Sequence, residues 1–221
     1  MHISQKNDIL NIDIAFVSEV KYLKPHLSLS QYRAMDLFFF CIMLVFSEGL
    51  INLAASKWFP EQPYTVSTTA AITAIVMVRW KGWGAIHALV GAVTICVVLG
   101  ASREQYIIYL AGNLLGLLGI LLIAGKQKVR VKKSGLYAVF YGIVVLLLMQ
   151  SGRALAALCF GYEFKLLLRF YATDSLSILF TALIIWISRR QDGLLEDQID
   201  YIKRVQEEEE EPARKGNTYE S

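Results

Sequence analysis

The sequence holds few of the residues that usually build metal or redox sites. Three cysteines and three histidines occur in 221 residues, no two cysteines form a CxxC pair, and the histidines are widely separated. This pattern excludes zinc-ribbon sites and thioredoxin-type redox pairs. The cysteines Cys41, Cys96 and Cys159 all lie in apolar segments, where a cysteine usually serves as a small hydrophobic residue.

Motifs of ATPases and of two common hydrolase classes are missing as well. The chain has no phosphate-binding GxxxxGK[ST] loop, no HExxH and no GxSxG. We therefore expect a protein that is not an enzyme and binds no cofactor of its own, so that any ATP is used by partner subunits. A membrane-embedded enzyme with Glu48 and Asp174 as acid and base stays open as an alternative.

A secretory signal sequence is not evident either. The first 35 residues are polar and carry neither an apolar core nor a small-residue cleavage site. Within them, apolar residues at helical spacing predict an amphipathic helix over 6–24 that Pro25 ends. Because its acidic and basic residues balance, we expect it on the membrane surface or against the cytoplasmic side of the protein.

Long apolar runs are what the sequence has in excess. The hydrophobic share is 55%, against about 45–50% in soluble domains, and the mean hydropathy is +0.45. The runs have about the length that crosses a bilayer. They predict an all-α membrane protein with six spans, between a segment 1–35 and a charged tail 189–221. The expected spans are 36–57, 64–80, 83–101, 104–124, 135–155 and 167–188.

The basic residues predict the orientation of these spans. The segment 126–133 is densely basic and lies between two apolar runs, so it is interpreted as a topology signal and not as a nucleic-acid site. Placing it in the cytoplasm puts both termini there too, and predicts a multi-pass protein of the cell membrane. All but five of the 22 lysines and arginines then face the cytoplasm; the five are Lys57, Arg103, Arg153, Lys165 and Arg169.

A few polar residues interrupt the spans, and each is costly in a bilayer. Counted along the predicted spans, six of them fall in the outer half: Glu48, Asn52, Asn113, Gln150, Arg153 and Asp174. The shared depth predicts a polar pocket open to the outside, lined by the first, fourth, fifth and sixth spans. The alternative is hydrogen bonding between helices, including an Arg153–Asp174 pair. His87 falls in the inner half and is interpreted as structural.

Aromatic residues gather near the outer loops. Trp58 and Tyr64 flank two prolines in the first outer loop, so they are candidates for a lid over the pocket, and Tyr171 lies in the sixth span near its outer end. Some of these aromatic residues belong to the usual interfacial belt. The predicted substrate-binding residues are Glu48, Asn52, Trp58, Tyr64, Asn113, Gln150, Arg153, Tyr171 and Asp174.

Two further patterns admit two interpretations each. Small residues recur every four positions in the third span (Gly84, Ala88, Ala92, Cys96, Gly100), which indicates either ordinary helix packing or a smooth face for a partner helix. In the tail, an apolar stripe from Leu195 to Val205 continues the sixth helix, and the acidic run 207–211 follows. This end is either a solvated, fraying helix or a docking helix for a cytoplasmic partner.

Two segments resemble S components of energy-coupling factor (ECF) vitamin transporters. One is the loop 79–85 (RWKGWGA), which leads into a Gly/Ala-rich span with Gly91-Ala92, and the other is the tail 189–198 (RRQDGLLEDQ). The resemblance covers about residues 28–205. It implies a subunit that captures a vitamin-like small molecule from outside, with cobalamin favoured. It also implies two kinds of partner, a membrane coupling protein and two ATPase subunits. In that family the subunit joins these partners and topples in the bilayer to release its substrate inside.

One feature departs from that family. Its first span often carries an Ala-xxx-Ala docking pattern, whereas the closest match here is Ser30-xxx-Ala34 at the membrane edge. The departure leaves the docking surface for the coupling protein open. A membrane assembly or structural protein without a small-molecule ligand is the alternative function.

Overall fold

The structure, a computed structural model, describes residues 28–58, 66–125 and 127–217, and every regular element within them is helical. The predicted all-α class is confirmed. Contacts divide the chain into the units Met1–Asp36 and Leu37–Ser221, and of the first unit only residues 28–36 are described. The amphipathic helix expected over 6–24, and Tyr64 in the first outer loop, lie outside the described residues.

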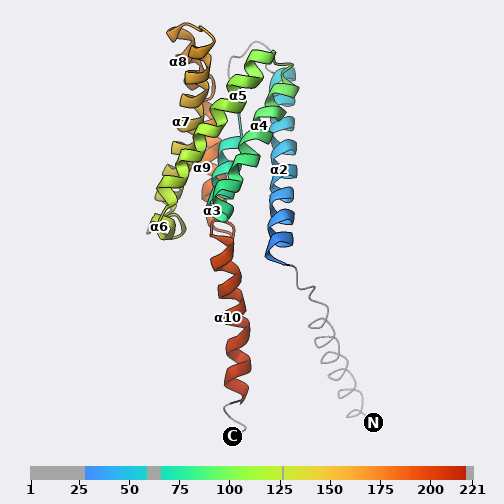
Figure 1. Cartoon of the computed structure of the whole chain (residues 1–221), viewed down its shortest axis with the longest axis vertical. Coiled ribbons are helices and arrows are strands. Elements are labelled where there is room, and N and C mark those ends of the chain that lie inside the picture. The colour runs from blue at the N-terminus through green and yellow to red at the C-terminus, as the bar shows by residue number, and fades with distance from the viewer. Residues whose placement is uncertain (1–27, 59–65, 126, 218–221) are drawn as a thin grey trace, which may run out of the picture. The chain divides into compact units, whose positions relative to one another are not determined.

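Eleven helical elements follow one another in these segments (Figure 1). In chain order they are α2 (Leu29–Trp58), α3 (Thr69–Trp80), the 3₁₀ turn η1 (Lys81–Trp83), α4 (Gly84–Val98), α5 (Arg103–Leu115), the 3₁₀ helix η2 (Gly116–Ile123), α6 (Gln127–Lys133), α7 (Gly135–Cys159), α8 (Phe164–Thr173), α9 (Ser175–Arg189) and α10 (Gln198–Asn217).

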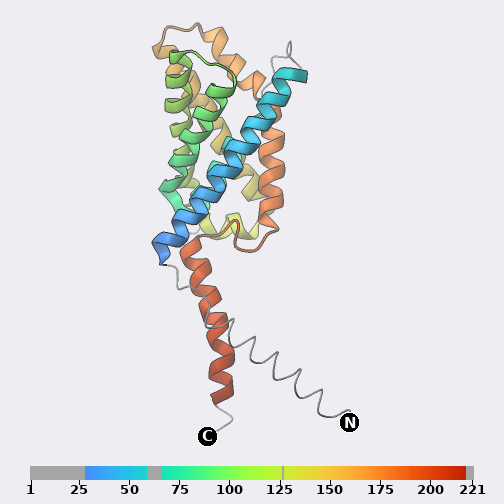
Figure 2. The same cartoon turned by 90° about the vertical axis from the view of Figure 1, so that its right-hand side faces the viewer.

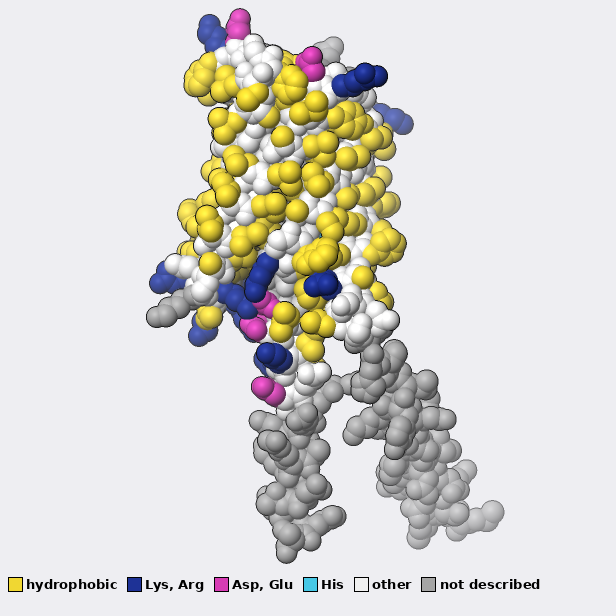
Figure 3. Space-filling model, viewed as in Figure 1, with side chains coloured by type: hydrophobic (Ala, Val, Ile, Leu, Met, Phe, Trp, Pro, Cys, Tyr) yellow, Lys and Arg dark blue, Asp and Glu magenta, His cyan; other side chains and the backbone are white. Residues whose placement is uncertain are grey.

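Four helical stretches are long and apolar enough to cross a membrane: Leu29–Trp58, Thr69–Val98, Arg103–Ile123 and Gly135–Cys159. The second stretch reverses direction within itself, because Lys81 has a φ of 54°. A Cβ placed on Gly84 would meet Met77, and one on Gly91 would meet Thr69, so α3 and α4 form an antiparallel hairpin. Figure 3 shows apolar side chains over the middle of the bundle and charged ones toward its two ends.

Side chains near the helix starts fix where the helices begin. Ser28 and Gln31 exchange side-chain and backbone hydrogen bonds, and Ser102 and Gln105 do the same at α5. Such reciprocal capping satisfies N–H groups that have no partner inside the helix. It explains why α2 begins at Leu29, seven residues before the start that apolar content alone predicted.

Helix α7 is the centre of the bundle and packs against α3, α5, α6, α8 and α9. The two views in Figures 1 and 2 show the neighbouring helices around it. The core that it organises includes fully buried side chains of three helices: Met77 of α3, Ile185 of α9, and Tyr141, Val145 and Met149 of α7.

Small residues allow the closest helix contact. A Cβ on Gly152 would lie 2.3 Å from the carbonyl oxygen of Gly112, so α5 and α7 touch backbone to backbone at this point. In the row expected on the third span, Gly84, Ala88 and Ala92 are all buried within the chain. Their burial favours ordinary packing over a face kept for a partner.

Two helix breaks differ from the predicted spans. The sixth span is divided at Asp174, where α8 ends and α9 begins. The tail does not continue α9 as predicted: the chain turns over 190–197, and α10 starts afresh. Arg79 donates to the carbonyl oxygens of Gly193 and Leu194, and Gly193 adopts a φ of 69° that a glycine accepts without strain. Leu195 is 5% exposed and joins the core.

The backbone contact of α5 with α7 predicts the effect of a single methyl group. Gly152→Ala is expected to lower the stability of the bundle by about 1–3 kcal/mol, because the Cβ has no room beside Gly112. Thermal unfolding of the detergent-solubilised protein measures the change. Gly49→Ala is the control, because open space surrounds that glycine and the substitution should stabilise α2 by about 0.5–1 kcal/mol. Equal melting temperatures for the two variants would contradict the packing.

Candidate functional site

A buried ion pair joins α7 to the break between α8 and α9. The Nη1 atom of Arg153 lies 2.9 Å from Oδ2 of Asp174, and the two side chains are 3% and 7% exposed. Gln150, one turn before Arg153 on α7, donates its Nε2 to the same carboxylate oxygen. The predicted pairing of Arg153 with Asp174 is confirmed.

Arg153 also binds α5, and through Asn113 of α5 it is connected to α4. Its Nε donates to Oδ1 of Asn113 at 2.9 Å, and the Nδ2 of Asn113 donates to the backbone oxygen of Ala88 at 2.9 Å. The guanidinium carbon lies 4.4 Å from the ring centre of Tyr109, within the range of a cation–π interaction. Arg153 and Asn113 together thus connect α4, α5, α7 and the start of α9.

The second carboxylate, Glu48, serves the start of α3. Its Oε2 accepts from the backbone N–H of Thr68 at 2.8 Å and from the hydroxyl of Thr68 at 3.0 Å. Asn52, one turn further along α2, donates its Nδ2 to the backbone oxygen of Glu48 at 2.8 Å. Glu48 and Asn52 are fully or nearly fully buried, and their spacing of four residues puts them on one face of α2.

The two carboxylates stand at two helix N-termini that meet. Ser67, two residues before α3, donates its N–H to the hydroxyl of Ser177 in the first turn of α9 at 2.9 Å. Glu48 is bound at the beginning of α3, and Asp174 immediately precedes α9. Because the N-terminus of a helix carries a partial positive charge, both carboxylates are placed where the backbone stabilises them.

The structure does not place every predicted residue in this network. Six of them belong to it: Glu48, Asn52, Asn113, Gln150, Arg153 and Asp174. Trp58 ends α2 with 75% of its surface exposed, and Tyr171 is partly exposed and hydrogen-bonds Ser151 at 2.8 Å. A role for these two in binding stays a prediction.

Sequence reasoning missed four members of the network: Ser67, Thr68, Tyr109 and Ser177. A signal for the first two was present, because the polar run 65–69 opens an otherwise apolar span. Tyr109 and Ser177 carry no such signal. A tyrosine in the outer half of a span looks like an interfacial residue, and a single serine in an apolar helix is common.

Some room for a ligand remains around the network. A hollow of about 100 Å³ lies beside Tyr109, lined by Ile95, Cys96, Leu99, Ala101 and Gln105, which is enough for about three water molecules. The Oε1 atom of Gln150 is buried and accepts no hydrogen bond among the described residues. Three larger hollows, of about 230, 420 and 470 Å³, are lined by residues of α6 and of the segment 189–200.

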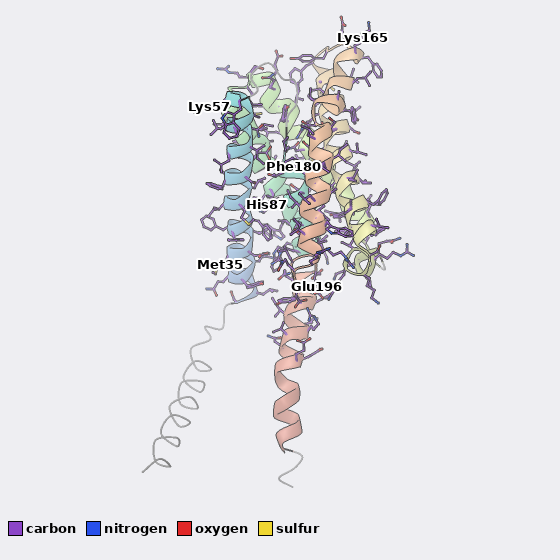
Figure 4. The ribbon with its side chains drawn as sticks, turned by 180° about the vertical axis from the view of Figure 1, so that it is seen from behind. Met35, Lys57, His87, Lys165, Phe180 and Glu196 are labelled. Carbon is purple, nitrogen blue, oxygen red and sulfur yellow. The ribbon has the colours of Figure 1, made fainter. Side chains whose placement is uncertain are left out.

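Figure 4 marks how these regions are separated. Lys57 and Lys165 lie at one end of the bundle and Glu196 at the other, with His87 between them. His87 is fully buried, and its Nε2 lies 3.2 Å from the backbone oxygen of Leu37 and 3.5 Å from the sulfur of Cys41. Its structural interpretation agrees with these contacts. Within the described ranges, no group of three or more His, Cys, Asp or Glu residues is arranged to hold a metal ion.

The end marked by Glu196 carries a second polar cluster, made of ion pairs. The Nζ of Lys128 lies 2.9 Å from Asp197 and 2.5 Å from Asp200, and the Nζ of Lys132 lies 2.6 Å from Glu196. Lys128 and Lys132 of the basic cluster therefore form ion pairs with the chain's own tail.

Three comparisons with known proteins complete this description. No protein-family model, no curated protein and no solved structure matches the chain. The function has to be argued from the chain's own geometry.

The ion pair predicts a strongly non-additive pair of substitutions. Arg153→Met or Asp174→Leu alone is expected to cost about 3–5 kcal/mol, because each leaves a buried charge without its partner. The double variant should be more stable than the sum of the two losses predicts. Unfolding in detergent, measured for all four proteins, checks this. Losses that simply add would mean that the pair contributes no coupling.

The tail ion pairs predict a pH dependence. Burial alone would raise the pKa of Asp197, but hydrogen bonding and charge from Lys128 outweigh it, and the net pKa lies below its ordinary 3.8. Burial opposes the rise in the pKa of Lys128, yet Asp200 and Asp197 raise it above 10.5. Because the pKa of Asp197 is lowered, its ion pair stabilises the docked tail at pH values above the pKa of a free aspartate, about 3.9. Because the pKa of Lys128 is raised, its ion pairs stabilise the docked tail at pH values below the pKa of a free lysine, about 10.4.

Docking of the tail should therefore be constant from about pH 5 to 9 and weaken below about pH 4 and above about pH 10.5. The mobility of a spin label on Gln206→Cys, in a protein whose native cysteines are replaced by alanine, reports it. Asp197→Asn should weaken docking at neutral pH and remove most of the change on the acid side. An unaltered acid-side transition in that variant would contradict the assignment.

Proposed function

We propose that this chain is the substrate-capturing membrane subunit of an ECF-type transporter, with six membrane crossings and both termini in the cytoplasm. Six helical segments support the crossings: α2, α3, α4, α5 with η2, α7, and α8 with α9. The basic segments around 126–133 and 189–190 support the orientation, since cytoplasmic loops are enriched in Lys and Arg.

The observation that carries the proposal is the buried network of Arg153, Asp174, Gln150 and Asn113. A charge within a membrane helix costs about 2.5–3.5 kcal/mol on insertion scales, and such residues commonly mark a path or site for a polar ligand. In this network the carboxylate of Asp174 forms an ion pair with the guanidinium of Arg153. A ligand with an anionic group can replace it there, and an N–H group of the ligand can meet the unpartnered Oε1 of Gln150.

The proposed ligand is a vitamin-like small molecule. The preference for cobalamin comes from the family resemblance alone, and the hollow of about 100 Å³ beside Tyr109 is far smaller than that molecule. Binding of any vitamin then requires the network to open, which separates the start of α9 from α7. The membrane coupling protein and the two ATPase subunits are proposed as the partners that use ATP to complete import.

One observation favours the alternative of a structural or assembly protein. The charged groups are already matched inside the chain, Arg153 by Asp174 and Asn113, and Glu48 by Thr68. A closed network of this kind holds helices together without any ligand. In that case neutralising Glu48, Arg153 and Asp174 would leave the role of the protein intact.

The two proposals differ in what purifies with the protein. We expect mass spectrometry to find a small molecule bound to the detergent-solubilised wild type. The Arg153→Ala plus Asp174→Ala variant should fold, because both charges are removed together, and should lose at least tenfold in affinity for that molecule by calorimetry. The control is Lys57→Ala plus Glu163→Ala, which removes the same charges from exposed positions.

Unchanged binding by the folded double variant would remove the network as the site. If no molecule accompanies the wild type, and none of a panel of vitamins binds it, the structural alternative is favoured.

A further inference from the structure

A cavity of about 230 Å³ lies where α9 ends. Its walls include Lys132 of α6, Arg189 and Arg190 at the end of α9, and Asp192 and Glu196 of the following turn. None of these residues belongs to the buried network of Arg153 and Asp174. The cavity is therefore separate from the site proposed for transport.

The acidic residues of this cavity are already paired. Glu196 lies 2.6 Å from Lys132 and 3.2 Å from Arg204, and Asp192 lies 3.1 Å from Arg204. Arg189 and Arg190 make no ion pair within the described part of the chain. Two guanidinium groups without counter-charges therefore line the cavity, because its two carboxylates are paired with Lys132 and Arg204.

Arg189 is held in place and keeps one donor unused. Its Nη2 donates to the backbone oxygen of Lys133 at 2.8 Å. Its Nε–H is buried and has no acceptor among the described residues. A buried N–H group without an acceptor is costly, and an anionic oxygen beside Arg189 would accept its hydrogen bond.

Apolar side chains continue from the cavity along the bundle. The guanidinium of Arg190 lies 5.8 Å from the ring centre of Trp186, and Trp186 is 41% exposed. Ile187 on α9 and Leu136 at the start of α7 are 51% and 80% exposed. A tryptophan beside basic residues at the edge of an apolar surface is typical of the interface between a bilayer and water.

We propose that this cavity binds the phosphate of an anionic phospholipid, with Arg189 and Arg190 as its donors and the acyl chains lying along Trp186 and Leu136. A guanidinium matches the geometry of a phosphate through paired N–H groups. The adjoining exposed apolar side chains point to a lipid, because a soluble phosphate would gain nothing from them.

Native mass spectrometry of the purified protein, titrated with phosphatidylglycerol and with phosphatidylcholine, tests the proposal. Each of Arg189→Gln and Arg190→Gln is expected to weaken phosphatidylglycerol binding about fivefold, since a basic residue near an anionic lipid contributes about 1 kcal/mol. Arg189→Lys should recover only part of the loss, because a lysine keeps the charge but lacks the Nε–H at this position. Arg190 is exposed, so Arg190→Gln should fold even if Arg189→Gln does not.

The matched control is Lys57→Gln, which like each arginine variant removes one positive charge, here from an exposed position outside the cavity. Phosphatidylglycerol binding should be unchanged in it. Equal losses in the control and in the arginine variants would show attraction by net charge only. Equal affinity for phosphatidylcholine would also overturn the proposal, and so would displacement of the lipid by millimolar inorganic phosphate or glycerol 3-phosphate, since that result would assign the cavity to a soluble anion.

Discussion

The fold depends on how backbone N–H groups are satisfied where helices begin inside the bundle. The first N–H groups of a helix have no partner within it, and a hydrocarbon surrounding offers none. At α3 the carboxylate of Glu48 accepts from Thr68, and the hydroxyl of Ser177 accepts from Ser67. The polar side chains of Glu48 and Ser177 thus satisfy the backbone at the start of α3. The ion pair of Arg153 with Asp174 adjoins these groups, because Ser177 lies in the first turn of α9, which begins directly after Asp174.

Placing these groups together requires small residues beside them. Gly112 precedes Asn113 on α5, and Gly152 precedes Arg153 on α7. A Cβ on Gly112 would lie 2.4 Å from the backbone nitrogen of Arg153, so both glycines are needed for the helices to approach. The hydrogen bond of 2.9 Å between Arg153 and Asn113 follows from this approach. Packing and polar bonding are therefore two parts of one contact, and neither is available without the other.

The sequence alone was sufficient to predict features that depend on the spacing of nearby apolar and polar residues. Apolar runs predicted the helices, and counting along them grouped Glu48 and Asn52 with the other polar residues of the network. The Arg153–Asp174 pair was predicted as an alternative, because two opposite charges in an apolar bundle are stabilised by meeting. The break at Asp174 and the turn at Gly193 were not predicted, since both depend on tertiary partners, Arg153 for the first and Arg79 for the second. For the same reason Ser177 and Tyr109 gave no sign of their roles.

Helix α9 connects the two polar regions of the molecule. Asp174 precedes its first residue and Arg189 is its last, so the 15 residues between them span about 22 Å. Asp174 is bound by Arg153 of α7, and Arg189 is bound by the backbone of Lys133 before α7 begins. Sliding of a straight α9 along its axis would displace both Asp174 from Arg153 and Arg189 from Lys133, whereas tilting about Arg189 would move Asp174 alone. The two polar ends of α9 are therefore coupled for a sliding motion of this helix and independent for a tilting motion about Arg189.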